Sequence, residues 1–98
     1  MIIRKEQALK IIADHREELK QFDVQALYLF GSVVRDEATE DSDVDIEVEF
    51  VSRPNFDRYI DLKFYLEDLL HAPVDLLTKS SIRPEIASYI EKEAIRAA

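Results

Sequence analysis

Hydrophobic positions in the first third of the chain change from a helical period to a dense strand-like run. From about Lys5 to Phe22 the less polar positions recur with helical spacing, which predicts an amphipathic helix. The positions on this stripe are Ala8, Ile11, Ile12, His15 and Leu19. Val24 to Phe30 is rich in apolar and aromatic residues and predicts a buried strand. We expect a short helix from Ser32 to about Asp36 and a polar loop from Glu37 to Ser42.

A strict alternation of apolar and acidic residues marks the segment from Asp43 to Val51. The apolar members are Val44, Ile46, Val48 and Phe50, and the acidic members are Asp43, Asp45, Glu47 and Glu49. Successive side chains of a strand point to opposite faces, so this pattern predicts a strand with one core face and one carboxylate face. We expect Glu47 and Glu49 to lie on a solvated surface.

The second half of the chain predicts a helix, a short strand and a final helix. Pro54 and Asn55 open a helix that continues through Leu70. Its expected apolar stripe contains Phe56, Tyr59, Ile60, Phe64 and Leu70. Val74 to Leu77 predicts a third strand, and a last helix starts at Ser81 or Arg83 with Pro84 and runs to about Ala97. This order predicts an α/β (α+β) fold with a small mixed sheet of about three strands, in one domain of residues 1–98.

Composition restricts the classes of function that need consideration. The chain has 98 residues, no cysteine and a formal net charge of −8. Thiol chemistry, disulfides and zinc–thiolate sites are therefore excluded, and the acidic surface argues against stable nucleic-acid binding. The chain shows neither a signal-peptide pattern at its start nor an apolar stretch of membrane-spanning length. We expect a soluble cytoplasmic protein with no membrane association.

Carboxylates on the alternating segment and on the third strand suggest a metal site. Residues two apart on a strand project to the same face about 6.6 Å apart, so Asp43 and Asp45 can converge on one cation. Asp75 alternates with Val74 and Leu76, so it points away from the core face. It joins the other two acids if its strand lies beside theirs. Oxygen-only ligands of this kind favour magnesium or manganese.

Each of these residues also has a simpler interpretation. Alternating acids and aliphatic residues are typical of any half-exposed strand. Gly31, the only glycine, can be a tight-turn residue, and Ser32 can cap a short helix. His15 and His71 are interpreted as packed or capping histidines rather than as functional groups.

The order and spacing of these residues are more specific than any one of them. Gly31-Ser32 is followed by ten residues and then by Asp43-Val44-Asp45. This arrangement resembles the signature of the DNA polymerase beta nucleotidyltransferase superfamily, and the small size is similar to that of its minimal nucleotidyltransferases, the MNT domain proteins. The strand around Asp75 matches their third-acid strand, so the resemblance covers nearly the whole chain. The chain has Val34 and Asp36 where many members have alanine and glycine.

The resemblance implies a nucleotidyltransferase fold and a role for each motif residue. Gly31 and Ser32 would hold the phosphates of ATP through backbone amides and the hydroxyl. Asp43, Asp45 and Asp75 would be the catalytic and metal-ligating acids, with Asp75 helping to deprotonate the acceptor hydroxyl. Arg35 would contact phosphate, although a surface salt bridge explains it equally well.

The resemblance also implies a reaction and a partner. Small members of the superfamily commonly pair with a helical HEPN toxin and adenylylate a tyrosine of it, which makes them antitoxins. We therefore expect a magnesium-dependent transfer of AMP from ATP to a hydroxyl, with a tyrosine of a HEPN toxin as the acceptor. The alternative is a non-catalytic module that masks a basic helical partner with its acidic surface. The sequence leaves open whether the chain forms an oligomer.

Overall fold

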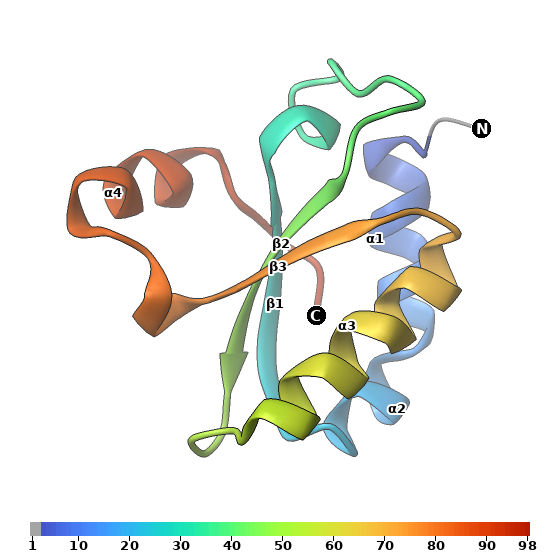
Figure 1. Ribbon diagram of the computed structural model, residues 1–98. Helices are drawn as coiled ribbons and strands as arrows, with labels where there is room; N and C mark the ends of the chain where they lie inside the picture. Colours follow the sequence, from blue (N-terminus) through green and yellow to red (C-terminus); the bar gives the residue numbers. More distant parts are fainter. Residues whose placement is uncertain (1–2) are drawn as a thin grey trace.

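A mixed sheet of four strands lies at the centre of the computed structural model, which describes residues 3–98. Helices α1, α2 and α3 cover one face of the sheet, and α4 lies on the opposite side (Figure 1). Along the chain the elements are α1 (Lys5–Asp14), α2 (Arg16–Lys20), β1 (Val24–Phe30), the 3-10 helix η1 (Gly31–Val33), β2 (Val44–Phe50), α3 (Phe56–Leu70), β3 (Val74–Thr78), the 3-10 helix η2 (Lys79–Ser81), α4 (Pro84–Glu93) and β4 (Ile95–Arg96). None of the helices in residues 3–98 has the length and apolar character needed to cross a bilayer.

The strand order β3-β2-β1-β4 combines antiparallel and parallel pairs. Strand β1 is antiparallel to both β2 and β4, whereas β2 and β3 are parallel. The parallel pair follows from its connection, since α3 carries the chain back along the sheet between the two strands. The predicted α/β class and small mixed sheet are confirmed, and β4 is an additional strand.

The first predicted helix is interrupted at His15. The His15 backbone (φ −111°, ψ 20°) leaves the helical conformation and ends α1, and α2 begins at the next residue. The His15 ring Nδ1 lies 2.7 Å from the carbonyl oxygen of Ile11, one turn earlier. His71 occupies the corresponding position at the end of α3, with a left-handed backbone (φ +52°). The prediction of one continuous helix from Lys5 to Phe22 was therefore wrong. Both histidines lie at helix ends, as the capping interpretation expects.

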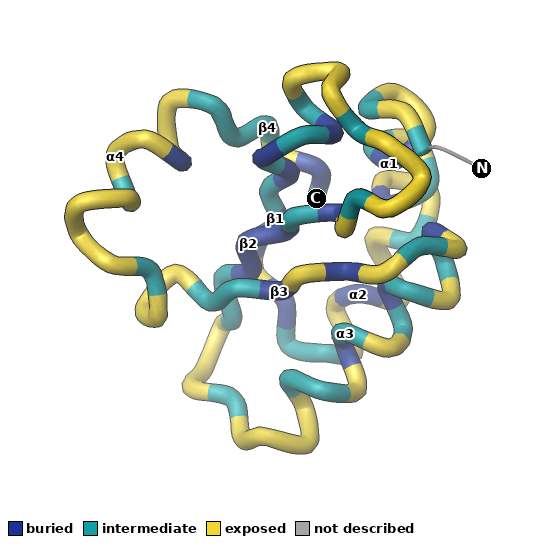
Figure 2. Tube along the Cα trace, turned by 45° about the horizontal axis from the view of Figure 1, so that its top comes forward, coloured by how far each residue is buried: buried dark blue, intermediate teal, exposed yellow. Residues whose placement is uncertain are grey.

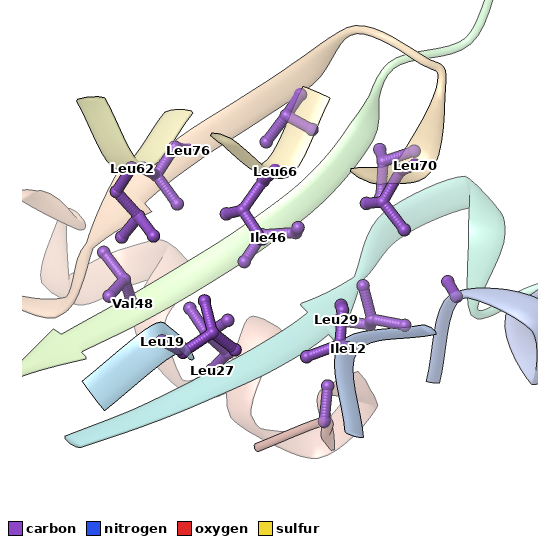
Figure 3. Packing of buried hydrophobic residues seen from close by; sticks show 14 of the residues in the cluster. Ile12, Leu19, Leu27, Leu29, Ile46, Val48, Leu62, Leu66, Leu70 and Leu76 are labelled. Atoms are coloured by element: carbon purple, nitrogen blue, oxygen red, sulfur yellow. The ribbon is translucent and has the colours of Figure 1, made fainter. Parts of the chain in front are cut away.

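The hydrophobic core lies between the sheet and helices α1 to α3 (Figure 3). Leu62, Leu66 and Leu70 are the buried residues of α3. The predicted stripe was wrong at Phe56 and Phe64, which are 74% and 55% exposed. This helix carries apolar residues on more than one side, and the leucines spaced by four residues are the ones that pack on the strands.

The end of the chain does not continue as the predicted helix to Ala97. Helix α4 ends at Glu93, and β4 then pairs with β1, placing Tyr28 opposite Arg96 and Leu29 opposite Ile95. The Ala97 N–H also donates to the Leu27 carbonyl at 2.7 Å. Strand β1 would otherwise present unpaired backbone groups at a sheet edge, and β4 satisfies them.

Candidate functional site

Gly31, at the junction of β1 and η1, is required there for two separate reasons. Its backbone is left-handed (φ +75°), a conformation that glycine adopts without steric cost. A Cβ atom on Gly31 would lie only 2.0 Å from Oδ2 of Asp45. Gly31 is therefore a buried residue whose backbone lies directly against the Asp45 side chain. The interpretation of Gly31 as only a tight-turn residue is incomplete.

Strand pairing brings Asp45 and Asp75 side by side. Asp45 lies opposite Phe30 in the antiparallel pair and opposite Asp75 in the parallel pair. The condition set by the sequence, that the third strand lies beside the second, is met. Asp43 lies one residue before β2 and is exposed, as is Asp75, whereas Asp45 is half-buried. The three predicted acids therefore share one end of the β2–β3 pair, next to Gly31.

Electrostatics at this end favours a bound cation. Burial, followed by the negative charges of Asp75 and Asp43, raises the pKa of Asp45 to about 6, and the Arg35 cation acts in the opposite direction. Within residues 3–98 no three acidic or histidine side chains are gathered closely enough to form a metal-binding group as they stand. The donor chemistry nevertheless fits magnesium, since carboxylate oxygens that repel one another are drawn together when a divalent ion neutralises them.

Ser32 lies within η1 rather than at its start, where Phe30 takes the capping position, so the capping interpretation of Ser32 was wrong. The Ser32 carbonyl accepts the Glu37 N–H at 2.9 Å, which closes the turn after Gly31. The hydroxyl is thereby held on the segment that follows Gly31. The sequence placed a short helix here, and the structure has a shorter 3-10 helix followed by a turn.

Arg35 forms ion pairs that the sequence left open. Its Nη1 donates to both carboxylate oxygens of Glu93, at 3.0 and 2.8 Å, and its Nε donates to Glu37 at 3.2 Å. These hydrogen bonds, chiefly the one to Glu93, raise the pKa of the guanidinium above its usual value. The Gly31 N–H also donates to Glu93. The salt-bridge interpretation of Arg35 is confirmed, and Glu93 is a partner of Gly31 and Arg35 that sequence reasoning missed.

Glu47 corrects one further expectation about the acidic face. It is only 6% exposed, so it does not lie on a solvated surface, and Glu49 is half-buried. Burial is the main cause that raises the pKa of Glu47, and nearby Lys79 opposes the increase. The prediction of a strand from the alternating pattern was correct, but the carboxylate face of the sheet is partly buried rather than fully exposed to solvent.

The small mixed sheet, with a glycine beside two paired aspartates, defines an α/β domain with an acidic strand edge, and known proteins share it. The family model for the nucleotidyltransferase domain matches residues 12–97. The chain is 44% identical over 91 residues to the protein adenylyltransferase MntA of Thermococcus cleftensis, and the match covers 92% of each chain. The protein belongs to the nucleotidyltransferase domain family.

Solved structures show the same fold. A candidate minimal nucleotidyltransferase superposes with a TM-score of 0.82 at 29% identity, and the match covers 95% of each chain. A second similar structure is that of a tri-AMPylated Shewanella oneidensis HEPN toxin in complex with its MNT antitoxin. It matches with a TM-score of 0.66 at 19% identity, over 92% of this chain and 71% of that one. The resemblance to minimal nucleotidyltransferases and the expectation of a nucleotidyltransferase enzyme are confirmed.

Proposed function

We propose that this protein is a magnesium-dependent protein adenylyltransferase that transfers AMP from ATP to a hydroxyl of a partner protein. The observation that carries the proposal is the meeting of Gly31 with the paired acids Asp45 and Asp75 at one end of the β2–β3 pair. The related MntA of Thermococcus cleftensis is named for the same activity. The reaction uses ATP as its nucleotide substrate, which agrees with a cytoplasmic location.

Asp43 and Asp45 are the residues that would hold the magnesium ion, with Asp75 as a further ligand, and manganese is an alternative of similar chemistry. When bound, the ion offsets the charge of the triphosphate and of the leaving pyrophosphate. The remaining contributions come from the chain itself. The Gly31 amide, the Ser32 hydroxyl and the Arg35 guanidinium bind phosphate oxygens, since all three are hydrogen-bond donors at the same edge of the sheet.

AMP transfer takes place by a single displacement at the α-phosphorus of ATP. The acceptor oxygen forms a bond to the α-phosphorus while the bond from this phosphorus to the bridging oxygen of the β-phosphate breaks. Pyrophosphate leaves, and the hydroxyl proton passes to the carboxylate of Asp75. Asp75 suits this role because it is exposed, so an acceptor can approach it from solvent.

We propose a tyrosine of a HEPN-type helical toxin as the acceptor, which would make this protein an antitoxin. The AMPylated HEPN toxin in complex with an MNT antitoxin, whose fold this chain shares, supports that choice. The open end of the β2–β3 pair is accessible to a macromolecule, since Asp43 and Asp75 are both exposed. The acidic net charge of −8 favours docking on a basic protein surface.

Transfer of label tests this proposal. The purified protein is incubated with magnesium, a HEPN protein from the same organism and ATP labelled at either the α- or the γ-phosphate. We expect label on the partner only from the α-labelled nucleotide, since adenylyl transfer keeps that phosphate. A matched reaction uses a partner whose candidate tyrosines are replaced by phenylalanine. Label from the γ-phosphate, or none from the α-phosphate, would contradict an adenylyltransferase.

A further inference from the structure

The carboxylate of Glu93 accepts hydrogen bonds from two of the groups proposed to bind phosphate. Its Oε1 accepts the Gly31 N–H, and both of its oxygens accept from Nη1 of Arg35, at 3.0 and 2.8 Å. Glu93 is largely shielded, with 15% of its side chain exposed, whereas Arg35 is 41% exposed. A single anion therefore bridges a backbone amide of the β1–η1 junction and the guanidinium that follows it.

We propose that Glu93 is a built-in phosphate surrogate, which occupies the triphosphate position in the free protein and must be displaced when ATP binds. This inference rests on the proposed function, because it assigns the Gly31 amide and Arg35 to the nucleotide. A carboxylate and a phosphate oxygen are both anionic acceptors and use the same donors. They cannot use them at once, so the contact acts as an autoinhibitory latch.

The part of the chain that carries Glu93 is attached in a way that permits release. Ile90 is the only buried residue of α4, and most of the helix is exposed (Figure 2). Glu93 is the last residue of the helix, and the next residue, Ala94, is already extended (φ −65°, ψ 139°). The helix can therefore turn about the Ala94 connection while β4 stays paired with β1.

A purely structural role for Glu93 makes the opposite prediction about affinity. If Glu93 only braces the β1–η1 junction, its loss disorders the Gly31 amide and weakens nucleotide binding. If it is a surrogate, its loss frees the donors. The apparent dissociation constant equals the intrinsic one divided by the fraction of molecules with an open site, so removing the competitor tightens binding.

Calorimetric titration with magnesium–ATP compares the wild type with Glu93→Gln. The matched control is Glu91→Gln, which removes the same charge from an exposed position of the same helix. We expect Glu93→Gln to bind about tenfold more tightly than the wild type, and Glu91→Gln to match the wild type. Equal or weaker binding by Glu93→Gln would overturn the surrogate while leaving the proposed function in place. No binding by any of the three proteins would overturn both.

A second measurement needs no variant. Hydrogen exchange in residues 84–93 of the wild-type protein is followed with and without saturating magnesium–ATP. Displacement of Glu93 removes an anchor at the end of α4, so we expect faster exchange in this segment when nucleotide is present. Unchanged or slower exchange would overturn the latch even if Glu93→Gln were to fold poorly.

Discussion

A methyl group on Gly31 would lie 2.0 Å from Oδ2 of Asp45. Non-bonded atoms do not approach so closely, so the Asp45 carboxylate would have to move aside, while the Asp45 Cβ, 3.1 Å from the added atom, belongs to a strand that is paired on both sides. The Asp45 carboxylate can therefore occupy its position only because Gly31 has no side chain. This contact links the first half of the sequence motif to the second.

Substitution of Gly31 tests that contact. We expect Gly31→Val to abolish magnesium–ATP binding, because the side chain displaces Asp45 and blocks approach to the backbone amide. The left-handed backbone should cost a further ~1–2 kcal/mol of folding stability. Thermal melting confirms that the variant folds, and calorimetry measures the nucleotide. A folded Gly31→Val protein that binds ATP with wild-type affinity would show that nothing needs to approach this position.

We expect Asp45→Asn to raise the stability of the metal-free protein and to remove its response to magnesium. A half-buried carboxylate beside Asp75 and Asp43 is unfavourable without a cation, so the neutral variant should melt at a higher temperature than the wild type at neutral pH. Magnesium should raise the melting temperature of the wild type and leave that of the variant nearly unchanged. Melting curves with magnesium and with a chelator measure both effects. An equal response of the two proteins to magnesium would remove Asp45 from the metal site.

Glu67 offers a test of how the strand that carries Asp75 is anchored. Its carboxylate accepts the Val74 N–H at 2.9 Å and pairs with Lys63 at 3.1 Å. The hydrogen bond to the backbone, and then that to Lys63, lower the pKa of Glu67 below its ordinary value. The charged form therefore stabilises the fold above the pKa of the unfolded chain, and this stabilisation is lost as the pH falls through the lower folded value.

Glu67→Gln should accordingly be less stable than the wild type at neutral pH. The difference should shrink as the pH falls below about 4, where the carboxylate is protonated in the unfolded chain and progressively in the folded one. Denaturant titrations at a series of pH values measure it. A difference that stays constant down to pH ~2 would mean that the charge of Glu67 contributes nothing.

Short-range patterns predicted the parts of this fold that depend on neighbours in the sequence. Strand β1 coincides with the predicted Val24–Phe30, and β2 lies within the predicted Asp43–Val51, because dense apolar runs and strict alternation are local signals. The buried side of α3 was predicted incorrectly because this helix has apolar residues on several sides. Which side is buried depends on how the helix packs on the sheet, and the sequence does not show this. Strand β4 went unpredicted because two residues carry no periodic signal.

The same distinction applies to the site. Gly31, Asp43 and Asp45 fall in one motif, so the sequence could place them together, and Asp75 required only that β3 lie beside β2. Glu93 could not be found in this way. It is 62 residues from Gly31 in the sequence, and its position depends on where α4 ends and on the pairing of β4 with β1.

The intact mass of a HEPN partner tests the adenylyltransferase account most directly. After incubation with this protein, ATP and magnesium, we expect the partner to gain the mass of one or more AMP groups and to stay inhibited once the two proteins are separated. Asp43→Asn should slow this gain about a hundredfold or more, because lost metal ligation removes several kcal/mol of transition-state stabilisation. Glu49→Gln, the same charge change at the far end of the strand, should not. An unmodified partner that recovers its activity on separation would contradict adenylyl transfer and leave masking as the mode of inhibition.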